Sequence, residues 1–187
     1  MHFRFPLVVA FVAIALARPV PGQQSHQVVV VVRHAEKDSV PKDDPPLTRA
    51  GVARAHALAA TLADADLGAV ITTDLRRSRE TGRIVAEERK LTTIMVARGA
   101  DIPAHARAVA AAVRVQHART VLVVGHGETV GPIIAALGGP EIPQLCADEY
   151  SDLFVLILDR GAAPRLIRSL YGEPSAPHRP NCAPMMR

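Results

Sequence analysis

The chain has 187 residues, of which 49% are hydrophobic and 21% are charged. This length and composition allow an ordinary buried core, which excludes disorder across the chain and a fold that depends on a disulfide scaffold. Aromatic residues make up only 3% of the chain, which argues against a nucleic-acid module that stacks bases on aromatic side chains. The net charge of +4 is spread along the sequence, and we expect no nucleic-acid partner.

The N-terminus has the pattern of a secretory signal peptide. A short basic start precedes an uninterrupted apolar run at residues 7–17, which ends in a small-x-small site. The run is shorter than the roughly 20 apolar residues of a spanning helix. We predict a signal peptide over residues 1–22, cleaved after Ala17 or Gly22, with export to the periplasm or the medium and no stable membrane anchor afterwards. A buried N-terminal strand or helix and an uncleaved anchor are the alternatives.

Strands and helices alternate along the rest of the chain. We expect parallel strands at 27–32, 69–72, 92–96 and 121–124, helices from Thr48 onward and at 74–89, 103–117 and 130–137, and a final hairpin of strands at 153–158 and 165–170. In the first helix, the 3.6-residue period places Val52, Ala55, Ala59 and Leu62 on the buried face.

This alternation predicts an α/β fold, a three-layer α/β/α sandwich with a mostly parallel central sheet. Nothing in the sequence divides residues 23–171, and we expect them to form one domain. The Pro-rich residues 172–187 are expected to be an extended or disordered tail.

Histidines and arginines gather where the predicted strands end. Arg33 and His34 follow the first strand, Arg77 lies shortly after the second, and His126 follows the fourth, next to Gly127. The carboxyl ends of parallel strands meet at one edge of a sheet, where open α/β folds bind ligands. Guanidinium forks match phosphate oxygens, and a neutral imidazole can attack phosphorus. The pattern therefore predicts a phosphoryl-binding site, in which the nearby arginines lower the pKa of the histidine.

The residues at these positions resemble the motifs of the histidine phosphatase superfamily, which has the phosphoglycerate-mutase-like fold. The resemblance spans roughly residues 28–170 and is strongest toward the compact bacterial branch, which includes phosphohistidine phosphatases. The matching motifs, in chain order, are Arg33-His34-Ala35-Glu36, Leu47-Thr48-x-x-Gly51, Thr73-x-Leu75-x-Arg77-Ser78-x-x-Thr81 and Gly125-His126-Gly127.

The resemblance implies a phosphatase that hydrolyses a phosphomonoester or phosphoramidate through a covalent phosphohistidine. It implies His34 as the phosphorylated nucleophile, and Arg33, Arg77, His126 and Gly127 as the phosphate pocket. The substrate would be a small phosphorylated molecule or a phosphoprotein, and the scheme needs neither a metal nor an organic cofactor. Arg77, not Arg76, occupies the motif position.

The sequence departs from the family pattern in its general acid. Larger members of that family supply a carboxylate from an inserted segment between the second and fourth strands, but the corresponding stretch here, residues 91–103, is short and holds only Asp101 among carboxylates. Glu128, beside His126, and Glu149, just before the hairpin, are the other candidates. We hypothesise that a reduced acid restricts the enzyme to substrates with easy leaving groups. The alternative is a non-catalytic phosphate-binding or interaction module that keeps the pocket without efficient turnover.

Other motifs in the chain are weaker. Gly125-x-Gly127-x-x-x-Gly131 has the wrong spacing for a dinucleotide-binding loop. His126-x-Glu128 is not followed by the Pro-Cys-x-x-Cys of zinc deaminases. The only two cysteines, Cys146 and Cys182, could pair after export or stay as two thiols.

Overall fold

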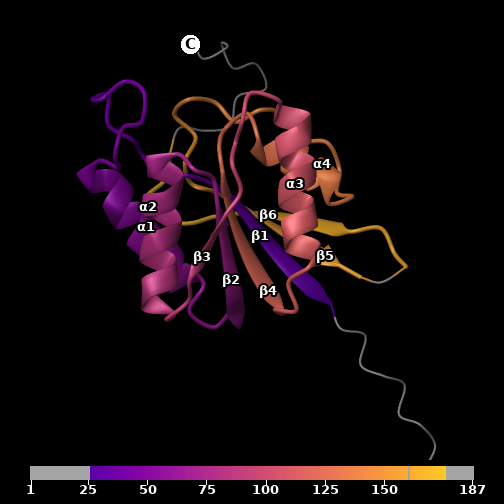
Figure 1. The fold of residues 1–187 in the computed structure, drawn as a ribbon. Helices are drawn as coiled ribbons and strands as arrows, with labels where there is room; N and C mark the ends of the chain where they lie inside the picture. The colour runs from indigo at the N-terminus through magenta and orange to yellow at the C-terminus, as the bar shows by residue number, and fades with distance from the viewer. Residues whose placement is uncertain (1–25, 160, 176–187) are drawn as a thin grey trace, which may run out of the picture.

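The computed structural model describes residues 26–159 and 161–175, which form one sheet with helices on both faces (Figure 1). The sheet order is β3-β2-β4-β1-β5-β6. The predicted α/β sandwich is confirmed, and observed element bounds lie within a few residues of the predicted ones. The elements are β1 (Gln27–Arg33), α1 (Arg49–Thr61), β2 (Leu67–Thr72), α2 (Arg76–Glu88), β3 (Thr93–Met95), α3 (Ile102–Arg114), β4 (Thr120–Gly125), α4 (Val130–Ala136), β5 (Asp152–Leu158) and β6 (Arg165–Leu170).

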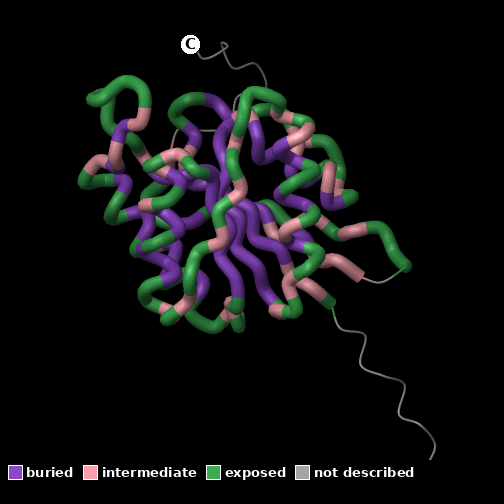
Figure 2. The backbone as a smooth tube through the Cα atoms, in the orientation of Figure 1, coloured by how far each residue is buried: buried purple, intermediate pink, exposed green. Residues whose placement is uncertain are grey.

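Strand β1 is buried on both faces at the centre of the sheet, as its run of valines predicts. Val29 and Val31 pack in the core under α3 and α4. Val30 and Val32 point to the opposite face, into the core with residues of α1 and α2. Figure 2 shows the buried residues concentrated in the strands and in the inner sides of the helices. The two cores hold the middle of the sheet rigidly, which fixes the direction of whatever follows each strand.

The register of the sheet brings three strand ends together. β1 runs parallel to β4, with Arg33 opposite Gly125, and β2 runs parallel to β4, with Thr72 opposite Val124. β5 is antiparallel to β1, and β6 is antiparallel to β5, as the predicted hairpin requires. The residues that follow β1, β2 and β4 therefore start from one edge of the sheet.

Helix α1 corrects one detail of the sequence prediction. Thr48 caps the helix as expected, with its hydroxyl accepting from the Gly51 amide at 3.0 Å. Val52, expected on the buried face, is 39% exposed, so that prediction is wrong. Gly51 faces inward instead. Only glycine fits there, because a Cβ at this position would lie 2.2 Å from the carbonyl oxygen of Glu36.

The ends of the chain are only partly described. The predicted signal peptide and residues 176–187, Cys182 among them, lie outside the described residues. Of the two cysteines, the buried Cys146 is disulfide-bonded. The start of the predicted tail is held in place, since the Ser175 hydroxyl accepts from the amides of Tyr150 and Ser151, each at 3.1 Å. Within residues 26–159 and 161–175, every helix is too short or too polar to cross a membrane.

Candidate active site

His34 stands at the end of β1 with its ring oriented by two neighbours. Its Nδ1 lies 2.7 Å from the carbonyl oxygen of Ala35, and Nε2 lies 3.2 Å from Nε of Arg77. A carbonyl can only accept and a guanidinium can only donate, so Nδ1 carries the hydrogen and Nε2 presents its lone pair. His34 is only 3% exposed, and burial, followed by electrostatic interactions with His126 and Arg33, holds its pKa well below the usual range. The direction agrees with the sequence prediction, but burial contributes more than the arginines do.

His126 faces His34 from the end of β4. The two ring centroids are 5.2 Å apart, and the rings meet at 60°. Nε2 of His126 lies 3.0 Å from the hydroxyl of Thr73, which also accepts from the Leu75 amide. Burial, and next the charge of Arg77, lowers the pKa of His126 to about 2. Both histidines are therefore neutral around pH 7.

The Arg33 side chain is held by backbone oxygens of the loop that precedes β5. Its Nη1 donates to the backbone oxygens of Cys146, at 2.6 Å, and Glu149, at 3.0 Å. The guanidinium carbon lies 4.1 Å from the ring centroid of Tyr150. Burial lowers the pKa of Arg33, which stays a cation because that pKa starts near 12.5.

Arg77 reaches the site from the first turn of α2, which the motif residues hold against the sheet. The Ser78 hydroxyl donates to the Val124 oxygen at 2.7 Å, and the Thr81 hydroxyl accepts from the Ala35 amide at 3.1 Å. These two bonds tie α2 to β4 and to the residue after His34. They explain why the hydroxyl residues of the motif accompany the arginine.

Two buried polar atoms of the site, Nε of Arg33 and Nδ1 of His126, have no hydrogen-bond partner among the described residues. Both belong to residues that the sequence predicted in the site. Groups that can donate hydrogen bonds, left unpaired in a buried polar site, fit an anionic ligand with several acceptor oxygens.

Sequence reasoning missed two residues of the site, Tyr150 and Arg98, and gave no role to Thr73, although Thr73 begins one of the quoted motifs. Tyr150 packs on Arg33, and its ring centroid lies 6.2 Å from that of His34. Arg98 follows β3 and interacts electrostatically with Arg77 and His126. The strand-end argument, applied to the third strand as well, would have found Arg98, whereas no local signal marks Tyr150.

The three candidate acids occupy different surroundings. Glu128 follows Gly127 and accepts from Arg98. Asp101 is exposed and caps α3, accepting from the Ala104 amide at 2.9 Å. Glu149 is buried and accepts from the Cys146 amide at 2.6 Å. No group of three or more His, Cys, Asp or Glu side chains suited to a metal ion occurs among the residues that the structure describes.

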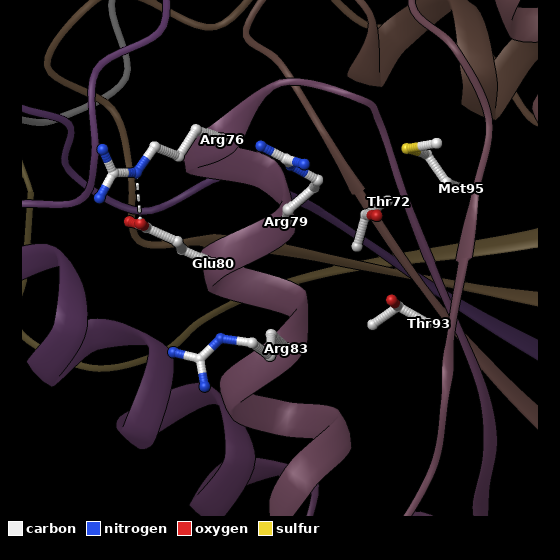
Figure 3. A pocket seen from close by; sticks show the side chains of 7 residues that line it. All are labelled: Thr72, Arg76, Arg79, Glu80, Arg83, Thr93 and Met95. Carbon is white, nitrogen blue, oxygen red and sulfur yellow. Dashed lines mark hydrogen bonds and ion pairs between the residues drawn. The ribbon is translucent and has the colours of Figure 1, made fainter. Parts of the chain in front are cut away.

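Arg76, the neighbour of Arg77, belongs to a separate pocket of about 350 Å³ between α2 and the strands β2 and β3 (Figure 3). Its Nε donates to Glu80 at 2.7 Å. The remaining residues around this pocket are Thr72, Arg79, Arg83, Thr93 and Met95. Arg77, at the motif position, reaches His34, whereas Arg76 pairs with Glu80.

Comparisons with known proteins point to one family. The family model of the histidine phosphatase superfamily (branch 1) matches residues 29–103. This confirms the resemblance over those residues, which include the motifs of Arg33, His34 and Arg77. No curated protein matches the chain.

Solved structures share the fold at low identity. A mycobacterial glucosyl-3-phosphoglycerate phosphatase in complex with inorganic phosphate aligns with a TM-score of 0.61 and 18% identity over 78% of this chain and 96% of its own. A Nakamurella multipartitia protein assigned as the phosphohistidine phosphatase SixA aligns with a TM-score of 0.58 and 22% identity over 81% of this chain and 98% of its own. A protein called mycobacterial hydrolase 1 aligns with a TM-score of 0.61 and 18% identity over 76% of this chain and 97% of its own.

Proposed function

We propose that this chain, matched over residues 29–103 by the histidine phosphatase superfamily, hydrolyses a phosphomonoester or phosphoramidate through a covalent phosphohistidine on His34. The observation that carries the proposal is the state of His34: a buried, neutral imidazole with its Nε2 lone pair facing the Arg77 guanidinium. A nucleophile beside fixed cations is what attack on a phosphoryl dianion requires.

The phosphoryl group would lie between the two histidines. Arg33 and Arg77 neutralise its two negative charges, and His126 and Gly127 complete the pocket. These groups are held in place before the substrate arrives, so they stabilise charge on the equatorial oxygens without reorganising.

Two displacements account for the reaction. The Nε2 lone pair of His34 attacks phosphorus, and the bond from phosphorus to the leaving oxygen or nitrogen breaks with its electron pair. Water then attacks the phosphohistidine, the P–N bond breaks, its electrons return to Nε2, and the proton of the water passes to solvent as phosphate is released. Arg33 and Arg77 serve both steps, because the same oxygens carry the charge in each.

The site indicates a class of substrate and not a particular molecule. We propose a small phosphorylated molecule or a phosphoprotein. The match to a phosphatase family and the fold shared with a phosphatase bound to inorganic phosphate support this class. We also propose export directed by residues 1–22, which would place the substrate outside the cytoplasm. Mass spectrometry of the mature N-terminus tests the export.

The test is hydrolysis of p-nitrophenyl phosphate by the full-length protein in EDTA. We expect the wild type to turn over and His34→Ala to lose at least about 1,000-fold of kcat. His56→Ala is the matched control, since His56 is an exposed histidine paired with Glu88. Quenching with radiolabelled substrate should leave label on the wild type that is stable in alkali and released by acid, as expected for phosphohistidine.

The alternative function has its own signature. If the wild type binds inorganic phosphate in calorimetry but hydrolyses no phosphoester or phosphoramidate, the chain is a phosphate-binding module. Turnover that survives His34→Ala would contradict the phosphohistidine route.

A further inference from the structure

An ion pair between Arg98 and Glu128 stands at the rim of the site. Nε and Nη2 of Arg98 both donate to Oε1 of Glu128, at 3.1 and 2.8 Å. The Arg98 backbone is held as well, since its amide donates to Oδ1 of Asp74 at 2.8 Å. The side chains are 28% and 21% exposed, so the pair is partly shielded from water. It is therefore a positioned contact between the loop after β3 and the start of α4.

Glu128 is the candidate acid that is surrounded by the cations of the site. Arg33 and Arg77 both interact electrostatically with it, in addition to the direct contact from Arg98. Asp101 is exposed and accepts from the Ala104 amide at the start of α3. Glu149 also interacts electrostatically with Arg33, and its carboxylate accepts from the amide of Cys146 in the loop that holds Arg33. Glu128 is the one of the three on which both Arg33 and Arg77 act, and we take it as the carboxyl that would deliver a proton to a leaving group.

The pairing with Arg98 works against that delivery. A general acid must carry a proton when the bond to the leaving group breaks. Two N–H groups of a guanidinium on one carboxylate oxygen form an ion pair with the ionised carboxylate, which has no proton to give. Arg98 lies outside the family motifs found in the sequence. Arg76 forms a similar pair with Glu80, but that pair joins two residues of the same helix.

We propose that Arg98 determines the leaving-group specificity of the enzyme by holding Glu128 as an ionised partner. Substrates are then those whose leaving group departs without being protonated by the enzyme, such as aryl phosphates and acyl phosphates, rather than esters of simple alcohols. This inference rests on the proposed function and names the substrate class of the same site.

The presence of Arg98 decides where the leaving oxygen obtains its proton. With Arg98 present, the P–O bond breaks, its electrons leave on oxygen, and solvent protonates that oxygen. Without Arg98, Glu128 in its acid form transfers its proton to the departing oxygen as the bond breaks and is left as the carboxylate. Only the second route accelerates poor leaving groups, because only it neutralises the alkoxide as it forms.

The experiment compares p-nitrophenyl, phenyl and methyl phosphate as substrates of the wild type, Arg98→Met and the double variant Arg98→Met/Glu128→Gln. The wild type should show a steep fall in kcat/KM as the leaving group becomes more basic. Arg98→Met should raise kcat/KM for phenyl phosphate relative to p-nitrophenyl phosphate by at least about tenfold. The double variant should lose that gain. Arg76→Met, which removes a similar arginine from a Glu80 pair, should keep the wild-type ratio.

Each other outcome counts against the inference. An unchanged ratio in Arg98→Met means that the pair is structural. A flat dependence in the wild type means that Glu128 already donates. A gain that survives Glu128→Gln means that the proton has another source. Circular dichroism spectra check that the variants are folded. Arg98→Lys keeps a cation at this position, so its kcat/KM for phenyl phosphate relative to p-nitrophenyl phosphate should equal that of the wild type. If the wild type hydrolyses none of the esters and forms no phosphoenzyme, the proposed function itself fails.

Discussion

The reaction centre and the rim of the site hold their charged groups in different ways. The reaction centre, defined as Arg33, His34, Thr73 and His126, is buried, and its side chains bond to backbone atoms or to one another. The rim, defined as Arg98 and Glu128, is partly exposed and held by one side-chain ion pair. Groups bonded to a packed backbone cannot shift without unfolding their surroundings, whereas an ion pair at a surface exchanges easily. We infer that the centre sets the reaction and the rim selects the substrate.

The strongest test compares Arg33, which is buried in the reaction centre, with Arg77, which is half-buried beside it. Arg33→Met leaves two buried carbonyls, of Cys146 and Glu149, without their donor, and we expect a loss of about 2–5 kcal/mol of unfolding free energy. Arg77→Met, at a half-buried position, should lose no more than about 1 kcal/mol. Both variants should lower kcat/KM at least about 100-fold, because in the proposed mechanism both cations stabilise the phosphoryl group. Urea denaturation and steady-state kinetics measure the two effects, and equal stability losses would contradict the distinction.

His34 and His126 make stability depend on pH, and the buried His105, whose pKa burial also lowers, adds to the effect. The pKa values of His34 and His126 in the folded protein are lowered, that of His126 to about 2, whereas unfolded histidine has a pKa near 6.5. The unfolded state therefore binds more protons below pH 6.5, and the free energy of unfolding falls as the pH decreases from there. Each histidine adds about 1.4 kcal/mol per pH unit to this slope. Urea midpoints at pH 7, 6 and 5 in phosphate-free buffer measure it.

A matched variant isolates the histidine contribution to that slope. His126→Asn removes one titrating ring, so its stability should depend less steeply on pH than that of the wild type, by about one histidine's share. Identical slopes would show that carboxylates alone cause the acid sensitivity.

The Thr73 hydroxyl should have the smallest effect within the reaction centre. Thr73→Val keeps the shape of the side chain and removes the bond to Nε2 of His126, so we expect kcat to fall by about fivefold to tenfold. KM should change less, because the pocket keeps both arginines. Thr73→Ser restores the hydroxyl and should recover most of kcat, which a purely structural loss would not allow.

The sequence predicted the central strand and the residues that follow it because the signals for both are local. A β-branched run predicts a buried strand, and the residue after a parallel strand lies at the ligand edge of the sheet whatever the loops do. Arg33, His34 and His126 were found in this way, and the family motif distinguished Arg77 from Arg76. Ala55, Ala59 and Leu62 are buried as predicted, and the error is confined to Val52. Gly51 faces inward in its place, because the close contact between Gly51 and Glu36 cannot be read from periodicity.

The sequence by itself determined the order of strands and helices, the edge at which the histidines gather and the three carboxylates that could serve as acids. Only the tertiary structure decided what each of those carboxylates contacts. Arg98 and Glu128 are separated by 30 residues of chain, and the bond between them depends on how β2 and β4 pair, how the loop after β3 folds back and how α4 begins. Local patterns set the elements because neighbouring residues share a backbone, but a charge finds its partner only when distant loops have been packed side by side.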